Sequence, residues 1–233
     1  MEYIKAVNDI LAKLNHSLLN RNLLMAAFQS IVHNDEAHNV EHVRAVILLG
    51  DEICTQMGVD DQTRRMVLTG CLLHDLGCRY DRKTHHLISY GLAFEYLDKY
   101  GRGEYSEQDI MLVARACLEH RASYEGQPTH LVSELVALAD RGNVTTEAYR
   151  EYYITRSIQF HGCNTKYNLD AVKEEVLKHI PDKFGKNGYA WKTYPEIGFK
   201  VFGDAIEELK AFSDNLAEVE KVIDRLFVKL NLV

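Results

Sequence analysis

A His-Asp pair stands at the end of a segment that should be buried. In QTRRMVLTGCLLHDL (residues 62–76), nearly every residue from Met66 to Leu73 is apolar or small, and His74 and Asp75 follow. An unpaired carboxylate at the carboxyl end of a buried helix loses its solvation and faces the negative end of the helix dipole. A cation in contact with both side chains would offset both of these energetic costs. The alternative is a solvent-exposed pair at a helix end.

Polar side chains at positions that should be buried recur on three other segments with helical periodicity. His42, His120 and Asp140 each lie on the apolar face of their segment, where spacing by three and four residues predicts burial. Taken singly, each has a structural alternative, which is a core histidine bonded to a carbonyl or an aspartate in a buried ion pair. Together with the His-Asp pair they form a set of imidazoles and carboxylates that suits Fe, Mn, Zn, Co or Ni.

These residues resemble a known signature. Residues 37–44 (AHNVEHVR), 72–77 (LLHDLG) and 138–141 (LADR) resemble the ordered His … His-Asp … Asp motif of the HD-domain superfamily of metal-dependent phosphohydrolases. The resemblance covers about residues 30–145. It implies an all-α, HD-domain-like helical bundle with a metal site in its interior. It also implies that His42, His74, Asp75 and Asp140 hold a first metal ion, with Asp75 and His74 as the catalytic pair.

The resemblance suggests a second ion as well. Family members with two metals add a histidine about ten residues after the pair, followed by a small residue four positions later. His85 fits this pattern through Ser89, although periodicity gives His86 an apolar stripe too. His120 fits the further histidine of the next helix. The implied cofactor is therefore two divalent transition-metal ions bridged by Asp75.

The implied reaction is hydrolysis of a phosphomonoester, nucleotide or phosphodiester by a metal-bridged hydroxide. Basic residues that follow the ligands are candidates to bind the phosphate, although each taken alone is better explained as a solvated charge: Arg79, Arg82, Lys83, Arg121 and Arg141, with Arg79 or Lys83 favoured among them. Two other functions stay open. One is an HD-type di-iron oxygenase, which carries the same four-histidine, two-aspartate set, and the other is a non-catalytic nucleotide-binding sensor.

Three details depart from the family pattern or lie beside it. Cys78 stands where many members have lysine after His-Asp-x-Gly. The Gly-Tyr-Pro motif of cyclic dinucleotide phosphodiesterases is absent between Asp75 and Asp140, so nothing supports that substrate. His38 lies one helical turn before His42 and is expected beside the ligands or at the surface rather than among them.

The elements that must position these residues are all helical. Apolar periodicity predicts helices over 3–14, 18–32, 41–57, 62–76, 86–99, 107–120 and 131–155. We expect an irregular stretch from Gly162 to about Tyr194, with a loop or short hairpin over 184–194, and helical structure from Glu196 to Leu230, interrupted near Ser213 as an N-cap. One domain over 1–233 is expected, with a motif core at 30–145 and a C-terminal helical extension at 146–233.

Composition narrows the function further. The 233 residues carry 27 Lys+Arg against 34 Asp+Glu, a net charge of −7, and 46% are hydrophobic. These values argue against disorder and against binding to a nucleic-acid duplex. No stretch is long enough for a membrane span, no secretory signal is visible, and the five cysteines lack a C-x-x-C pair. We therefore expect a cytoplasmic protein with reduced cysteines, mainly in the core, and a small phosphorylated substrate. The C-terminal helices are expected to be core, with a homodimer interface as the alternative.

Overall fold

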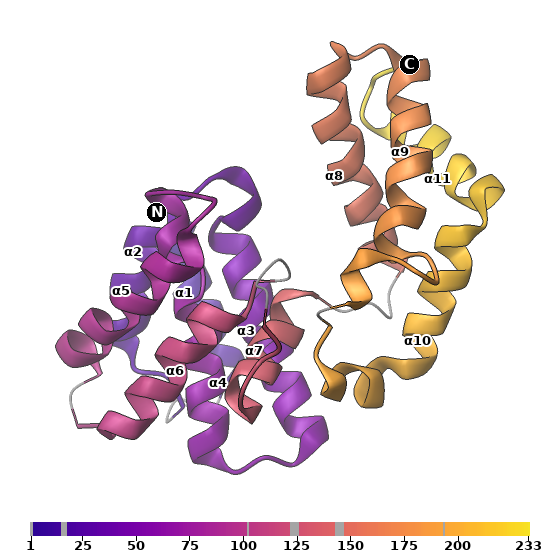
Figure 1. Ribbon diagram of the computed structural model, residues 1–233. Coiled ribbons are helices and arrows are strands. Elements are labelled where there is room, and N and C mark those ends of the chain that lie inside the picture. The colour runs from indigo at the N-terminus through magenta and orange to yellow at the C-terminus, as the bar shows by residue number, and fades with distance from the viewer. Residues whose placement is uncertain (1, 15–17, 102, 122–125, 143–146, 193) are drawn as a thin grey trace. The chain divides into compact units, whose positions relative to one another are not determined.

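The computed structural model describes every residue except 1, 15–17, 102, 122–125, 143–146 and 193. All regular structure in the described residues is helical, which confirms the all-α prediction (Figure 1). The chain forms two compact units. The first comprises residues 1–142 together with Pro195–Ile197, and the second comprises Asn143–Tyr194 and Gly198–Val233.

The first unit contains the helices that carry the predicted ligands. Its elements in chain order are α1 (Glu2–Lys13), α2 (Arg21–Ile31), the 3-10 helix η1 (Glu36–His38), α3 (Val40–Met57), α4 (Asp61–Leu73), the 3-10 helix η2 (Leu76–Arg79), α5 (His85–Tyr100), α6 (Glu107–Glu119) and α7 (Leu131–Asp140).

Helix α4 lies at the centre of this unit. Every residue from Met66 to Leu73 is buried, as the apolar sequence predicted, and α4 packs against α3, α6 and α7. Close approach depends on Gly70, where an added Cβ would lie 2.6 Å from Cγ2 of Val136 on α7. Burying α4 on most sides leaves its carboxyl end, and the His-Asp pair that follows, inside the unit.

The second unit has its own core. It contains α8 (Glu147–Thr165), α9 (Leu169–Phe184), the 3-10 helix η3 (Tyr189–Trp191), most of α10 (Glu196–Asp214) and α11 (Leu216–Lys229). Buried residues of α8, α9 and α11 pack together: Ile154, Ile158, Val172, Val176, Ile180, Val219, Ile223, Leu226 and Phe227. The sequence led us to expect one domain with a C-terminal extension, whereas here the C-terminal helices bury apolar side chains among themselves.

Several expectations for the C-terminal half were wrong. The expected irregular stretch 162–194 contains the sixteen-residue α9, whose buried stripe of Val172, Val176 and Ile180 outweighs Pro181 in its last turn. The predicted helix over 131–155 is two helices, α7 and α8. After α9 ends at Phe184, the described residues up to Tyr194 form a loop that contains η3, which agrees with the loop alternative and not with the hairpin.

The final two helices follow the expected break closely. Helix α10 ends at Asp214, and the N-cap of α11 is Asn215 rather than Ser213, with its side chain accepting from the backbone N–H of Glu218. Ser213 is buried instead, and its hydroxyl donates to the carbonyl of Leu209. In the part of the chain that the structure describes, no helix combines the length and the apolarity that a bilayer-spanning segment needs.

Candidate metal centre

The His-Asp pair sits where α4 ends. His74 is the C-cap residue of α4, and its N–H still donates to the carbonyl of Gly70. Asp75 is the first residue outside the helix. His74 is completely buried and Asp75 is only 1% exposed, so the exposed-pair alternative does not apply. The carboxylate is therefore held in the interior and needs positive charge or hydrogen bonds around it.

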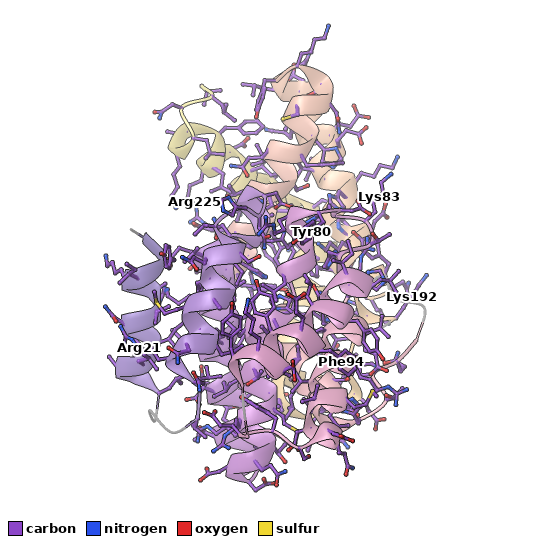
Figure 2. All side chains as sticks on the ribbon, turned by 90° about the vertical axis from the view of Figure 1, so that its left-hand side faces the viewer. Arg21, Tyr80, Lys83, Phe94, Lys192 and Arg225 are labelled. Atoms are coloured by element: carbon purple, nitrogen blue, oxygen red, sulfur yellow. The ribbon has the colours of Figure 1, made fainter. Side chains whose placement is uncertain are left out.

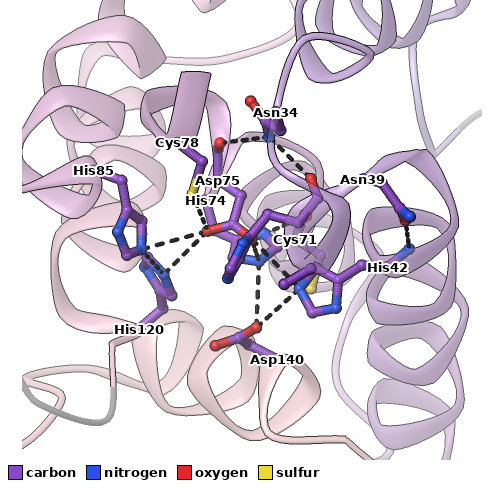
Figure 3. Close-up of polar contacts among 12 residues, drawn as sticks. Asn34, Asn39, His42, Cys71, His74, Asp75, Cys78, His85, His120 and Asp140 are labelled. Carbon is purple, nitrogen blue, oxygen red and sulfur yellow. Dashed lines mark hydrogen bonds and ion pairs between the residues drawn. The ribbon is translucent and has the colours of Figure 1, made fainter. Parts of the chain in front are cut away.

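One oxygen of Asp75 faces three of the predicted ligands (Figure 3). Its Oδ2 lies 3.4 Å from Nε2 of His42 and 3.1 Å from Nε2 of His74. Asp140, the last residue of α7, closes the group, since its Oδ1 lies 3.2 Å from His42 and 3.4 Å from His74. Helices α3, α4 and α7 thus each bring donor atoms to one point.

The other oxygen of Asp75 faces a second pair of imidazoles. Its Oδ1 lies 3.4 Å from Nε2 of His85 and 3.6 Å from Nε2 of His120, and these two nitrogens are 3.2 Å apart. The structure therefore places His85, rather than His86, in the cluster. All six residues predicted as ligands lie together, with Asp75 between two groups of donor atoms.

The small residue after His85 has a structural role. Ser89 is buried, and its Oγ accepts a hydrogen bond of 2.9 Å from the backbone N–H of Gly77, two residues after the His-Asp pair. At Gly77 an added Cβ would meet the carbonyl oxygen of His85. Glycine at 77 and serine at 89 thus let α5 approach η2 closely enough for His85 to reach Asp75.

Backbone carbonyls orient three of the four imidazoles. Nδ1 of His74 lies 2.8 Å from the carbonyl oxygen of Cys71. His85 and His120 repeat the arrangement three residues back, with the carbonyls of Arg82 at 2.7 Å and Cys117 at 2.8 Å. A carbonyl only accepts, so Nδ1 carries the proton, and in the neutral ring Nε2 presents its lone pair. These lone pairs point to the two oxygens of Asp75.

The cluster meets two tests for a metal site. Donor atoms about 2.1 Å from a shared ion, at angles of about 90–110°, lie roughly 3.0–3.4 Å apart, and the two groups show separations of 3.1–3.6 Å. Moreover, Nε2 of His42, Nε2 of His74 and Oδ2 of Asp75 are buried without a hydrogen-bond partner among the described residues. Bound cations would satisfy all three atoms.

The charges of the cluster favour cations as well. Burial lowers the pKa of His42, but Asp140 and Asp75 raise it to about 9. Burial likewise opposes protonation of His74, and the same carboxylates hold its pKa well above the usual value. Burial raises the pKa of Asp75, yet the surrounding histidines hold it well below its ordinary range. Without a metal ion, protons therefore occupy positions that a divalent ion would take.

Residues 39–142 match the family model of the HD domain. This part of the chain is an HD domain. The match confirms the resemblance drawn from the sequence, and it spans all six of the clustered residues. HD domains bind divalent metals, and the superfamily consists in general of metal-dependent phosphohydrolases, with some non-catalytic members. Searches of curated proteins and of solved structures found no match.

A short segment before the HD domain holds the cluster from one side. Nδ2 of Asn34 donates to the carbonyl oxygens of both Asp75 and His38, each at 3.0 Å. This clamp connects the end of α2 to the His-Asp pair. Sequence reasoning missed Asn34, because a single amide in a loop carries no periodic signal.

At the rim of the HD domain, His38 lies beside the ligands, as expected. Its ring centroid is 5.7 Å from that of His42. Nδ1 of His38 lies 2.7 Å from Oδ1 of Asp35, and Nε2 lies 2.6 Å from NH1 of Arg82. Solvent reaches this edge of the cluster, since the side chains of His42 and Asp140 are 21% and 22% exposed.

The residues predicted to bind the phosphate are spread around the HD domain. Arg121 directly follows His120, and its guanidinium donates to the carbonyl oxygen of Lys83. The Lys83 side chain itself is exposed (Figure 2). Arg79 is exposed, donates to Oγ of Ser30 on α2 and stacks 4.9 Å from the ring centroid of Tyr80. Arg141, by contrast, is buried next to Asp140.

The cysteines are all free, and four of the five are buried. Cys78 does more than pack in the core. Its Sγ donates a hydrogen bond of 3.5 Å to Oδ1 of Asp75. At the position where many family members have lysine, this chain therefore has a neutral donor to the central carboxylate.

Proposed function

We propose that the protein is a metal-dependent phosphohydrolase acting on a phosphomonoester, nucleotide or phosphodiester. One observation carries the proposal: the two oxygens of Asp75 face two separate groups of nitrogen and oxygen donors. His42, His74 and Asp140 would hold one divalent ion with Oδ2, and His85 and His120 a second with Oδ1. Bound ions supply Lewis acidity and lower the pKa of a coordinated water.

The residues of this chain would orient the metal ligands and bind the phosphate. Fixed tautomers would keep the Nε2 lone pair of His74 aimed at the first ion position, and those of His85 and His120 aimed at the second, without reorganisation during the reaction. On the solvent-exposed edge, Arg82 stands beside His38, one turn before His42, and Arg121 follows His120. Guanidinium groups in these positions would bind and orient the phosphate oxygens.

The test begins with protein purified without added metal. We expect about two equivalents of divalent metal by elemental analysis, and phosphate release from at least one member of a panel of nucleotides and phosphomonoesters. Arg82→Gln and Arg121→Gln should each raise KM on that substrate while leaving the metal content unchanged. Lys221→Gln, an exposed cation on α11 of the second unit, is the matched control.

Other outcomes would overturn the proposal. Two equivalents of iron with a mixed-valence signal in electron paramagnetic resonance, and no phosphate release, would instead indicate an oxygenase with the same ligand set. A protein that binds nucleotides without turnover and without metal would be a sensor. In that case the placement of Asp75 and Asp140 among the histidines would have to serve a purpose other than metal binding.

A further inference from the structure

Two histidines of the second unit face each other across neighbouring helices. Nε2 of His161, on α8, lies 3.3 Å from Nδ1 of His179, on α9. The hydroxyl of Ser157, one turn before His161, lies 2.9 Å from the same Nδ1. Three donor atoms therefore meet beside a cavity of about 780 Å³, which His161, His179 and the carboxylates of Glu175 and Asp182 help to line.

The two short contacts at Nδ1 of His179 cannot both be full hydrogen bonds. Nδ1 of an imidazole has either one proton or one lone pair. Nδ1 of His179 can therefore make only one full hydrogen bond, although both Ser157 and His161 lie within reach of it. A cation between the three atoms would satisfy the lone pairs of both imidazoles at once. Their nitrogen separation of 3.3 Å falls in the range of roughly 3.0–3.4 Å expected around a shared ion and resembles that of His85 and His120.

The outer nitrogens of both rings have the partners that metal-binding histidines usually have. Nε2 of His179 lies 3.3 Å from the hydroxyl of Tyr189, and Nδ1 of His161 lies 3.9 Å from Oε2 of Glu175. Oxygen atoms behind a ligating imidazole fix its tautomer and raise its basicity.

We propose that Ser157, His161 and His179 form a second metal site, which binds a divalent transition ion that prefers imidazole nitrogen, such as Zn²⁺, Ni²⁺ or Cu²⁺. The ion would join α8 to α9, and the cavity leaves positions on it for water or a carboxylate. This site lies outside residues 39–142 and does not depend on the proposed hydrolase activity.

The experiment uses the full-length chain, stripped with a chelator and titrated with Zn²⁺ by calorimetry. His161→Ala and His179→Ala should each lower the number of bound equivalents by one relative to the parent. His33→Ala, which removes an exposed histidine of the first unit, should leave that number unchanged. Glu175→Gln should weaken binding at this site by ~10-fold, because it removes the negative charge behind the ring of His161.

Two further readings keep the test decisive. His161→Gln and His179→Gln retain hydrogen-bonding capacity, so they separate loss of a ligand from loss of packing. With Cu²⁺, the difference between the paramagnetic resonance spectra of the parent and of His179→Gln should show coupling to two imidazole nitrogens. If the His161 and His179 variants bind as many equivalents as the parent with the same affinity, the site does not exist. If the first unit binds no metal, the difference of one equivalent between the parent and the His161 and His179 variants can still be measured.

Discussion

The substitution Asp75→Asn would test the metal centre most directly, because it keeps the shape of the side chain and removes its charge. The carboxylate oxygens of Asp75 lie within 3.1–3.6 Å of four imidazole nitrogens. In asparagine one of those oxygens becomes an N–H donor, which cannot bind a cation. At least one group of donors therefore loses its shared ligand, and both lose the negative charge between them.

The size of the effect follows from linkage between binding and folding. An ion present at 100 times its dissociation constant stabilises the folded state by about 2.7 kcal/mol, so two ions contribute about 5.4 kcal/mol. For a unit of this size, 1 kcal/mol corresponds to roughly 2–4 °C in Tm, and metal should raise the Tm of the parent protein by ~10–20 °C. In Asp75→Asn we expect less than half of that gain.

Calorimetric scans with metal and with chelator measure the gain, and elemental analysis counts the ions. Asp109→Asn is the matched control, because Asp109 is also buried but serves the capping box of α6 with Ser106. That variant should lose about 1 kcal/mol from the weakened cap and keep its full metal response. If Asp75→Asn retained two equivalents and the whole rise in Tm, our reasoning about the cluster would be refuted.

Three further predictions concern neighbouring residues. His85→Ala should lose one metal equivalent and His86→Ala none, and elemental analysis giving the reverse would exchange their roles. In the metal-free protein the pKa of His42 is raised to about 9, above its unfolded value of 6.5. Its contribution to stability is therefore full below pH 6.5 and lost as the pH rises to about 9. Urea unfolding of the parent and of His42→Gln should show this difference shrinking across that window, and a growing difference would contradict the charge assignment. Asn34→Ala should cost about 1 kcal/mol in unfolding free energy, because the carbonyls of Asp75 and His38 lose the amide that joins them while Asp75 keeps its bond from the backbone N–H of Cys78, and an unchanged urea midpoint would show that the clamp is unimportant.

Much of the cluster could be predicted because polar side chains conflicted with apolar periodicity. His74 and Asp75 follow eight buried residues of α4, and no surface position is compatible with that pattern. Periodicity could not separate His85 from His86, and only the family spacing to Ser89 favoured His85, which the structure places beside Asp75. Asn34 was beyond sequence reasoning, because its bond to the carbonyl of Asp75 joins segments that are distant in the chain.

The C-terminal half was less predictable for a different reason. Without a chemical motif, only periodicity remained, and Pro181 obscured the stripe of α9. The stripe is nevertheless regular, since Val172, Val176 and Ile180 are four residues apart and all buried. Pro181 lacks the N–H that would bond to the carbonyl of Leu177, and its ring crowds that carbonyl, yet α9 continues to Phe184, whose side chain is also buried.

The clustered residues lie at or next to the ends of helices, where backbone groups are free to bond to side chains. His42 lies in the first turn of α3, His85 begins α5, His74 and His120 cap α4 and α6, and Asp140 ends α7. At the ends of α4 and α6 the last carbonyls lack helical N–H partners, and those of Cys71 and Cys117 accept from the two capping imidazoles. Each carbonyl thus gains a donor while the ring beside it is fixed with its lone pair inward. Substituting His74 or His120 would therefore leave a backbone carbonyl without its donor and also remove a ligand. A glutamine side chain would restore neither the bond to the carbonyl nor the position of the ligand atom.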